Sequence, residues 1–485
     1  MKKESKLFLS IFLTILFFLV LSISLFAQKE IPLTTTSPEA KEFLIQARDL
    51  IENGDIIKGE ALLDKAIALD NTFALAYLYK TFYASNPDVR DENLKNAILY
   101  SGYASKGEQL QIEIVKNYSD NNISKARMIE DALIQMFPED PRPMFYKSSN
   151  LYNAGENAKA LEILKKVVQI KPDFPQAHNL LGYIYMGMGD YDNAKKELQQ
   201  YIALVPDYPN PYDSYGELLL KTGDYDGAIK NFQTSFAKDK TFQRSLYMIG
   251  NAYLFKSDYN AARDYYRKFA EASNNPNSKL LAKRLKSISY VYENNIDEAL
   301  NNFNQYRDIA ETENNKMEAI KSYAYEGLIL CENGRTAEAL DKFNEYNKRI
   351  NKMPLSWQEK ASLNAYSDLD LAYAYALNNE IEEAKDKVEQ AIDEVEKKDD
   401  IELMNKYNFT LGLIEYQQGN YSSAITIMKK INTPNCQQRY YLAQAYNKVG
   451  DTESANKLCG EIKNLNENQL NSAVIWNKVK QLSMK

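Results

Sequence analysis

The sequence predicts an all-α fold, arranged as a solenoid of helix-turn-helix repeats. Three kinds of residue recur at one common interval of 34 positions. The recurring positions are Ala126, Ala160, Ala194, Ala228 and Ala262; Gly182, Gly216 and Gly250; and Pro138, Pro172 and Pro206. Self-similarity at a fixed interval of this length is typical of repeat architectures, in which each unit buries its apolar side against its neighbours.

One unit, residues 175–208, shows why these residue types recur. Gly182 and Ala194 lack bulk where two antiparallel helices cross, which lets the backbones approach closely. Gly189 provides a tight turn, because glycine accepts a left-handed conformation, and Pro206 ends the second helix. We expect the two helices over residues 176–188 and 191–204.

The hairpin can be followed beyond the regular region by the spacing of its two small residues. In the best units this spacing is 12 positions, as from Gly182 to Ala194. The same spacing recurs at Ala47–Gly59, Ser287–Ala299, Gly327–Ala339, Ala372–Ala384, Gly412–Ala424 and Ala443–Ala455. The predicted units are 40–73, 107–140, 141–174, 175–208, 209–242, 243–276, 280–315, 320–353, 365–398, 405–434 and 436–468. The unit 107–140 is irregular, because Ile114 and Glu130 stand where a small residue and an aromatic residue are expected.

These units predict the organisation of the whole chain. We expect a signal peptide or uncleaved anchor at 1–27, a linker at 28–39, a regular array at 40–276 with a degenerate pair at 74–106, a divergent array at 277–468, and a C-terminal capping helix at 469–485. A terminal cap is expected because the last repeat of an open solenoid has one unpaired face.

The first 27 residues indicate where the protein is located. A basic start precedes an uncharged apolar run that ends at Ala27, which is typical of a secretory signal peptide. The run from Leu7 to Ala27 is also long enough to span a membrane, so a retained anchor is the alternative. We expect export to the periplasm or outer envelope of a bacterium. In the alternative, the chain is anchored in the inner membrane through residues 7–27, with the repeats outside the cytoplasm.

Composition argues against several classes of function. The net charge of -7 disfavours a nucleic-acid binder, which needs a basic surface. With His178 as the single histidine and no C-x-x-C among three cysteines, no metal site is expected. No glycine-rich phosphate loop follows a predicted strand, and no cofactor is expected. The sequence therefore predicts a non-enzymatic protein, in which His178 has a structural role.

The repeat resembles a known family. The unit 175–208 contains His178-x2-Leu181-Gly182-x2-Tyr185, then Ala194-x3-Leu198, then Pro206. This resembles the tetratricopeptide repeat, whose signature is W-x2-L-G-x2-Y, A-x3-F and P. The resemblance implies a right-handed superhelix whose concave face, lined by the first helix of each hairpin, binds a protein or peptide.

Counting in steps of three and four along the first helices gives the residues expected in this groove. The candidates are Arg142, Phe145, Asn179, Tyr183, Asp213, Glu217, Tyr247 and Asn251. Amide, aromatic and charged groups of this kind suit an extended peptide, although an ordinary solvated face has the same composition. The lysines of the family's carboxylate clamp are missing, so binding of an acidic chaperone tail is not expected.

These observations predict an interaction scaffold that binds a protein or peptide partner in the cell envelope. Two alternatives remain open at this stage. The chain could be a glycan-binding or small-molecule-binding component of an envelope uptake system. It could also be a membrane-anchored sensor arm that docks to a membrane-bound enzyme.

Overall fold

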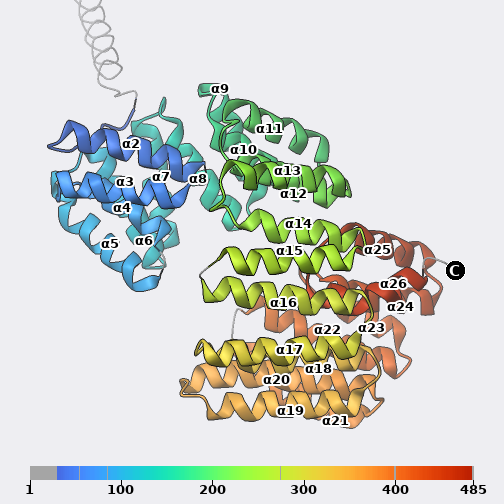
Figure 1. Cartoon of the computed structure of the whole chain (residues 1–485). Helices are drawn as coiled ribbons and strands as arrows, with labels where there is room; N and C mark the ends of the chain where they lie inside the picture. The colour runs from blue at the N-terminus through green and yellow to red at the C-terminus, as the bar shows by residue number, and fades with distance from the viewer. Residues whose placement is uncertain (1–29, 54, 85, 274, 398–399, 483–485) are drawn as a thin grey trace, which may run out of the picture. The chain divides into compact units, whose positions relative to one another are not determined.

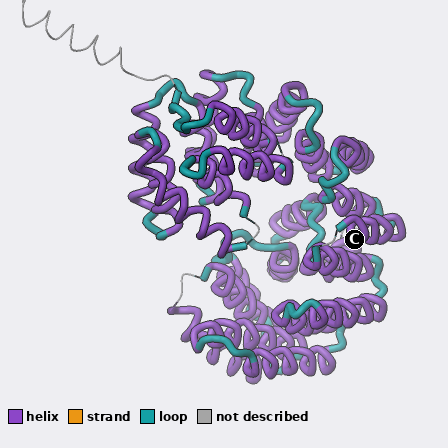
Figure 2. The backbone as a smooth tube through the Cα atoms, turned by 60° about the vertical axis from the view of Figure 1, so that its left-hand side comes forward, coloured by secondary structure: helices purple, strands orange, loops and turns teal. Residues whose placement is uncertain are grey.

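The computed structural model describes residues 30–53, 55–84, 86–273, 275–397 and 400–482. These residues form helices joined by short turns, with no strand among them, which confirms the predicted all-α solenoid of helical hairpins (Figures 1 and 2). The apolar run from Leu7 to Ala27 lies outside the described residues. Within the described part, no helix is both long and apolar enough to span a bilayer.

The chain folds into two compact units. Unit 1 contains the residues up to Leu218 together with Ala237–Phe242. Its helices are α2 (Pro38–Glu52), α3 (Ile56–Leu69), α4 (Ala74–Tyr83), α5 (Pro87–Tyr100), the 3-10 turn η1 (Ser101–Tyr103), α6 (Lys106–Ser119), α7 (Ile123–Met136), α8 (Pro141–Asn153), α9 (Asn157–Ile170), α10 (Pro175–Gly187) and α11 (Tyr191–Leu204). The boundary between the units crosses α12 (Asn210–Thr222) and α13 (Tyr225–Lys238).

Unit 2 contains Leu219–Phe236 and the residues from Gln243 onward. Its helices are α14 (Arg244–Phe255), α15 (Tyr259–Ala272), α16 (Pro276–Tyr292), α17 (Ile296–Thr312), α18 (Lys316–Glu332), α19 (Thr336–Lys352), α20 (Trp357–Leu377), α21 (Ile381–Lys397), α22 (Ile401–Gln417), α23 (Tyr421–Met428), α24 (Cys436–Val449), α25 (Thr452–Asn464) and α26 (Leu470–Leu482). Each helix of this series packs against the next one along the chain.

In four hairpins, a glycine of the first helix faces a large residue of the second: Gly182, Gly250, Gly327 and Gly412. A Cβ atom added to Gly182 would lie 2.5 Å from Leu198 Cγ, and one added to Gly327 would lie 2.6 Å from Phe343 Cε1. Leu198 and Phe343 are both fully buried. The two helices of a hairpin therefore cross closely at the small residue, as the sequence spacing predicts. This close crossing is found in both units.

The turns that join the helices of a hairpin share one backbone conformation. Asn121, Gly155, Gly189, Gly223 and Ser257, at successive 34-residue steps, all have a positive φ, from 58° to 85°. The amide that follows this residue donates to a carbonyl near the end of the first helix, as Asp258 N does to Tyr253 O at 2.9 Å. This left-handed turn closes each helix end, and glycine suits it because it has no side chain.

Replacing Ser257 with glycine should therefore stabilise unit 2. Ser257 has a φ of 63°, in which an L-residue with a Cβ atom is strained by about 1 kcal/mol. We expect Ser257→Gly to raise the free energy of unfolding by about that amount. Asn294→Gly is the matched control, with a smaller expected gain, because asparagine tolerates its φ of 64° better than serine does. Urea titration monitored by tryptophan fluorescence measures both variants. A loss of stability in Ser257→Gly would show that the left-handed turn at Ser257 is not strained.

The first described residues are held against the body of unit 1. Asp70 accepts hydrogen bonds from the Thr36 amide at 2.8 Å and from the hydroxyls of Thr35 at 2.6 Å and Thr72 at 2.7 Å. Burial favours the neutral acid, but these hydrogen bonds outweigh it and hold the pKa of Asp70 well below its usual value. Ile31 N also donates to Asp140 Oδ2 at 3.1 Å, so residues 31–36 form an extended strap across the helices.

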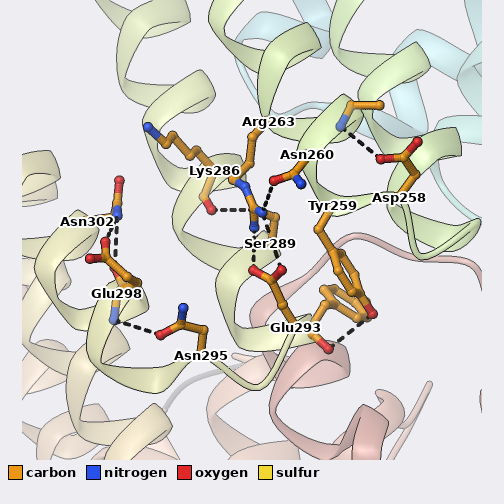
Figure 3. Close-up of polar contacts among 12 residues, drawn as sticks. Asp258, Tyr259, Asn260, Arg263, Lys286, Ser289, Glu293, Asn295, Glu298 and Asn302 are labelled. Carbon is orange, nitrogen blue, oxygen red and sulfur yellow. Dashed lines mark hydrogen bonds and ion pairs between the residues drawn. The ribbon is translucent and has the colours of Figure 1, made fainter.

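Figure 3 shows how adjacent hairpins join in unit 2, at α15, α16 and α17. Asp258 and Asn295 cap the helices that they precede, α15 and α17, by accepting from the amides of Ala261 and Glu298. Arg263 of α15 donates to Glu293 Oε2, just after α16, at 2.7 Å, and its guanidinium lies 4.3 Å from the centre of the Tyr290 ring. The side chain of Arg263 thus links one hairpin to the next, and the two caps end the turns within each hairpin.

The C-terminal segment contacts helices far from it in the sequence. Helix α26 packs against α16 and α18, besides its neighbours α24 and α25. Asn466 accepts a hydrogen bond from the Tyr225 hydroxyl at 2.8 Å and donates to Leu220 O at 3.1 Å. The Tyr292 hydroxyl donates to Glu467 O at 2.8 Å. Unit 2 therefore closes on itself, whereas repeats in an open solenoid contact only their nearest neighbours.

Candidate ligand-binding pocket in unit 1

Unit 1 contains a pocket of about 560 Å³, which we call the unit-1 pocket. Its walls come from α2, α4, α6, α8 and α10, the first helices of successive hairpins, together with α7. Its aromatic lining residues are Tyr79, Phe82, Tyr83, Tyr118, Phe145, Tyr146 and Tyr183. A concave space of this size, lined by aromatic rings with a few polar groups, is typical of ligand sites.

One wall of the pocket carries a carboxylate bound by tyrosine. The Tyr146 hydroxyl donates to Glu52 Oε1 at 3.0 Å, and the Tyr79 and Tyr146 hydroxyl oxygens lie 2.9 Å apart. Burial raises the pKa of Glu52, against the attraction of the Arg48 and Arg142 guanidinium groups. Glu52 therefore lies beside two cations that partly balance its charge.

A second carboxylate lies in the wall formed by α7. Glu130 is 4% exposed, and its Oε1 atom accepts from the Tyr118 hydroxyl at 3.0 Å and from Asn150 Nδ2 at 2.7 Å. Burial raises the pKa of Glu130, while these two hydrogen bonds and Lys147 lower it. Burial and the neighbouring charge of Glu130 raise the pKa of Tyr118 to about 12. Glu130 Oε2 takes no hydrogen bond from the residues that the structure describes.

A third carboxylate, Glu217, is linked to the pocket through the lining residue Tyr183. The Tyr183 hydroxyl contacts Glu217 Oε1 at 2.9 Å and Ser214 Oγ at 3.2 Å. Burial raises the pKa of Glu217 to about 7, although the hydrogen bond from Tyr183 favours the ionised form. Each of Glu52, Glu130 and Glu217 is thus a carboxylate with a tyrosine donor.

Several polar atoms around the pocket have no hydrogen-bond partner among the described residues. They are Gln111 Oε1, Gln176 Oε1 and Asn179 Oδ1 in the unit-1 pocket, and Arg48 Nε and Arg142 Nε in an adjoining pocket of about 420 Å³ beside residues 30–33. Buried polar groups are normally paired, and unpaired ones point to a water molecule or a ligand. Gln176 is the clearest case, because only 7% of it is exposed.

The structure brings five of the eight predicted groove residues to this region. Phe145, Asn179 and Tyr183 line the unit-1 pocket, Arg142 lines the adjoining one, and Glu217 is bonded to Tyr183. The sixth, Asp213, is buried, with 1% of the residue exposed, and lines neither pocket.

The last two predicted groove residues lie on α14 in unit 2. The Tyr247 ring packs edge to face against Phe269, with centroids 5.1 Å apart. Asn251 Oδ1 accepts from the Tyr266 hydroxyl at 2.9 Å and from Asn468 Nδ2 at 2.8 Å. The Asn251 oxygen is thus occupied by the C-terminal segment of the chain itself.

Sequence reasoning missed Glu52, Tyr79, Phe82 and Tyr146 of the pocket. The first three lie where the 34-residue columns are lost or shifted, so the groove-facing positions of α2 and α4 could not be counted from the repeat. A signal for Glu130 was present, because this acid stands where the repeat carries an aromatic or aliphatic residue.

No group of three or more potential metal ligands is found among the described residues. His178 contacts Glu197 Oε2 through Nδ1 at 2.6 Å and Pro172 O through Nε2 at 2.8 Å. Burial lowers the pKa of His178, but the hydrogen bonds with Glu197 and Pro172 outweigh burial and raise it. These contacts tie α10 to α11 and to the preceding turn.

Comparisons with known proteins agree with this repeat structure. Two tetratricopeptide repeat profiles match residues 151–214 and 243–276. No curated protein sequence matches the chain.

Solved structures also resemble parts of the chain. The C-terminal part of a TPR repeat-containing protein from Cytophaga hutchinsonii is 17% identical, with 54% of this chain and 98% of that one covered and a TM-score of 0.34. PilF of Pseudomonas aeruginosa is 16% identical over 44% and 94%, with a TM-score of 0.34. YrrB, a TPR protein with an unusual peptide-binding site, is 17% identical over 40% and 96%, with a TM-score of 0.30. On the strength of the two profile matches and the hairpins described above, the chain is a tetratricopeptide repeat protein.

Proposed function

We propose that this protein is an interaction scaffold that binds a protein or peptide partner in the unit-1 pocket. The observation that carries the proposal is the pocket itself, where unpaired amide oxygens of Gln111, Gln176 and Asn179 accompany aromatic rings in the lining. Amide groups can bond the backbone of an extended peptide, and aromatic rings can anchor its side chains. The repeat family supports the same function, since TPR hairpins present such surfaces.

The proposal assigns no reaction to the pocket. Its lining residues include no histidine or cysteine, and Tyr118, Tyr146 and Tyr183 are each hydrogen-bonded to a carboxylate. We further propose that the chain acts outside the cytoplasm, in the bacterial cell envelope, because its first 27 residues have the pattern of an export signal.

The test is an array of immobilised random dodecapeptides, probed with the purified full chain. We expect a subset to bind, and we expect the double variant Phe82→Ala/Asn179→Ala to bind them at least about tenfold more weakly, because a truncated anchor residue costs about 1–2 kcal/mol. Phe82 is 50% exposed and Asn179 Oδ1 has no partner, so these changes should leave the fold intact.

Tyr103→Ala is the matched control. Tyr103 is an exposed aromatic residue of unit 1, at 69%, that does not line the pocket, so its loss should not change binding. If no peptide binds, or if the double variant binds as well as the parent chain, peptide binding in this pocket is wrong.

A pocket of about 560 Å³ with aromatic walls also suits a small molecule such as a glycan. This second candidate is distinguished by a thermal-shift screen of sugars, since a ligand that binds only the folded state raises the unfolding temperature. A sugar that raises it, together with an array that binds no peptide, would favour the second candidate.

A further inference from the structure

Glu130 breaks a rule that the rest of the repeats obey. The position four residues after the small residue of the second helix otherwise carries an uncharged side chain, which is buried except at the half-buried Cys459. Examples are Leu63, Leu164, Leu198, Phe232, Tyr266, Phe303 and Phe343, all fully buried. In α7 the small residue is Ala126, and the same position is Glu130, also buried at 4% exposure. Ionised groups at core positions are costly, so a carboxylate here calls for an explanation.

The hydrogen bonds within unit 1 satisfy only half of this carboxylate. Tyr118 and Asn150 both donate to Oε1, which leaves Oε2 without a donor among the described residues. Glu130 lines the unit-1 pocket, so a ligand in the pocket can reach this side chain. A bound water molecule would satisfy Oε2 equally well, which is the plain structural alternative.

The charges around Glu130 favour a cation. Lys147 is the positively charged residue of the pocket lining, and its Nζ atom is ion-paired with Asp131 Oδ1. Arg127, which is near Tyr118, is ion-paired with Glu156. The cations already present near Glu130 therefore have carboxylate partners of their own. At the Glu52 wall, by contrast, the charges of Arg48 and Arg142 partly balance the carboxylate.

The rest of the pocket lining also carries groups that bind cations. Aromatic rings attract ammonium and guanidinium groups through their π faces, and the pocket is lined by seven of them. The chain as a whole carries a net charge of -7, which favours encounters with a basic partner.

We propose that the Glu130 end of the unit-1 pocket binds a lysine or arginine side chain of a peptide partner. This inference rests on the proposed function and adds the chemistry of the partner. The carboxylate Oε2 atom accepts a hydrogen bond from the ammonium or guanidinium group, and Tyr118 and Asn150 hold the carboxylate in place through Oε1.

The test uses the same dodecapeptide array and the full chain. Bound peptides should be enriched in lysine or arginine. For the tightest arginine-containing peptide, replacing that arginine with citrulline, which has the same shape and no charge, should weaken binding at least about tenfold. In the variant Glu130→Gln, the affinity for the arginine peptide should fall to the level of its citrulline counterpart.

Glu162→Gln is the matched control. It removes one negative charge from α9 of unit 1 at a solvent-exposed position, where the side chain is 74% exposed. If Glu162→Gln weakens arginine binding as much as Glu130→Gln does, the effect is a general one of net charge and the inference is wrong.

The remaining outcomes separate the two proposals. Peptide binding without enrichment in basic residues, or equal binding of arginine and citrulline peptides, would overturn the cation site while leaving the scaffold function intact. Failure of every peptide to bind would overturn both. Free spermidine displacing the arginine peptide would support the cation site, whereas selective binding of spermidine with no peptide bound would overturn the peptide partner. Circular dichroism of Glu130→Gln confirms that the variant is folded.

Discussion

Replacing Glu332 with methionine should lower the free energy of unfolding of unit 2 by at least about 3 kcal/mol, as expected when a buried ion pair loses one partner. The Glu332 side chain is buried at the end of α18. It accepts from Gln437 Nε2 at 2.5 Å, Lys478 Nζ at 2.5 Å, Tyr441 hydroxyl at 3.2 Å and the Tyr373 hydroxyl. Methionine keeps the volume but leaves these donors without an acceptor.

The conservative variant Glu332→Gln separates charge from hydrogen bonding. Its amide oxygen can still accept from some of the donors, so the loss should be smaller than in Glu332→Met. Both tryptophans of the chain, Trp357 and Trp476, lie in unit 2, so fluorescence during urea titration reports on this unit alone. Equal losses in the two variants would mean that charge, and not the hydrogen-bond network, stabilises this part of unit 2.

Truncating Ile475 to alanine should cost unit 2 about 2–5 kcal/mol, the usual range for a fully buried aliphatic side chain. Ile475 lies on α26, is 0% exposed, and belongs to a core that includes Tyr292 of α16 and Ile329 of α18. If α26 were an appendage at the end of an open solenoid, its loss would affect only the last repeat.

The matched control is Ile401→Ala, the same substitution at the first turn of α22 in the same unit. Ile401 is 59% exposed, so its truncation should change stability by no more than about 0.5 kcal/mol. The same urea titration measures both variants. A loss in Ile475→Ala as small as that in Ile401→Ala would show that the C-terminal helix is not part of the unit 2 core.

The hairpins could be predicted from sequence because their packing is local and repeated. The fit of Gly182 to Leu198 requires one small and one large residue at a fixed spacing, and a spacing that recurs is visible in the sequence. The left-handed turn was predicted at Gly189, although asparagine and serine at the equivalent Asn121 and Ser257 hide the same turn from a search for glycine.

The closure of unit 2 could not be predicted, for a physical reason. Asn466 and Asn468 contact residues more than 200 positions away through hydrogen bonds of their side chains, and no periodicity connects such pairs. The same limit affects the predicted site. Counting along α14 places Asn251 on one helix face, but the count contains no information on Asn468, which donates a hydrogen bond to Asn251.

The pocket was partly predictable. Phe145, Asn179 and Tyr183 were found because α8 and α10 lie in the regular repeats, where helix phase is known. Glu52 was not found, because its role depends on a hydrogen bond from Tyr146, which is 94 residues away.

Photo-cross-linking tests most directly whether the unit-1 pocket is the binding site. A peptide selected on the array is labelled with benzophenone at a central residue, bound to the full chain and irradiated, and the linked residues are identified by mass spectrometry. We expect links to α4, α8 and α10, at lining residues such as Phe82, Phe145 and Leu180. Links confined to the second helices α3, α5, α9 and α11, or to unit 2, would contradict this expectation.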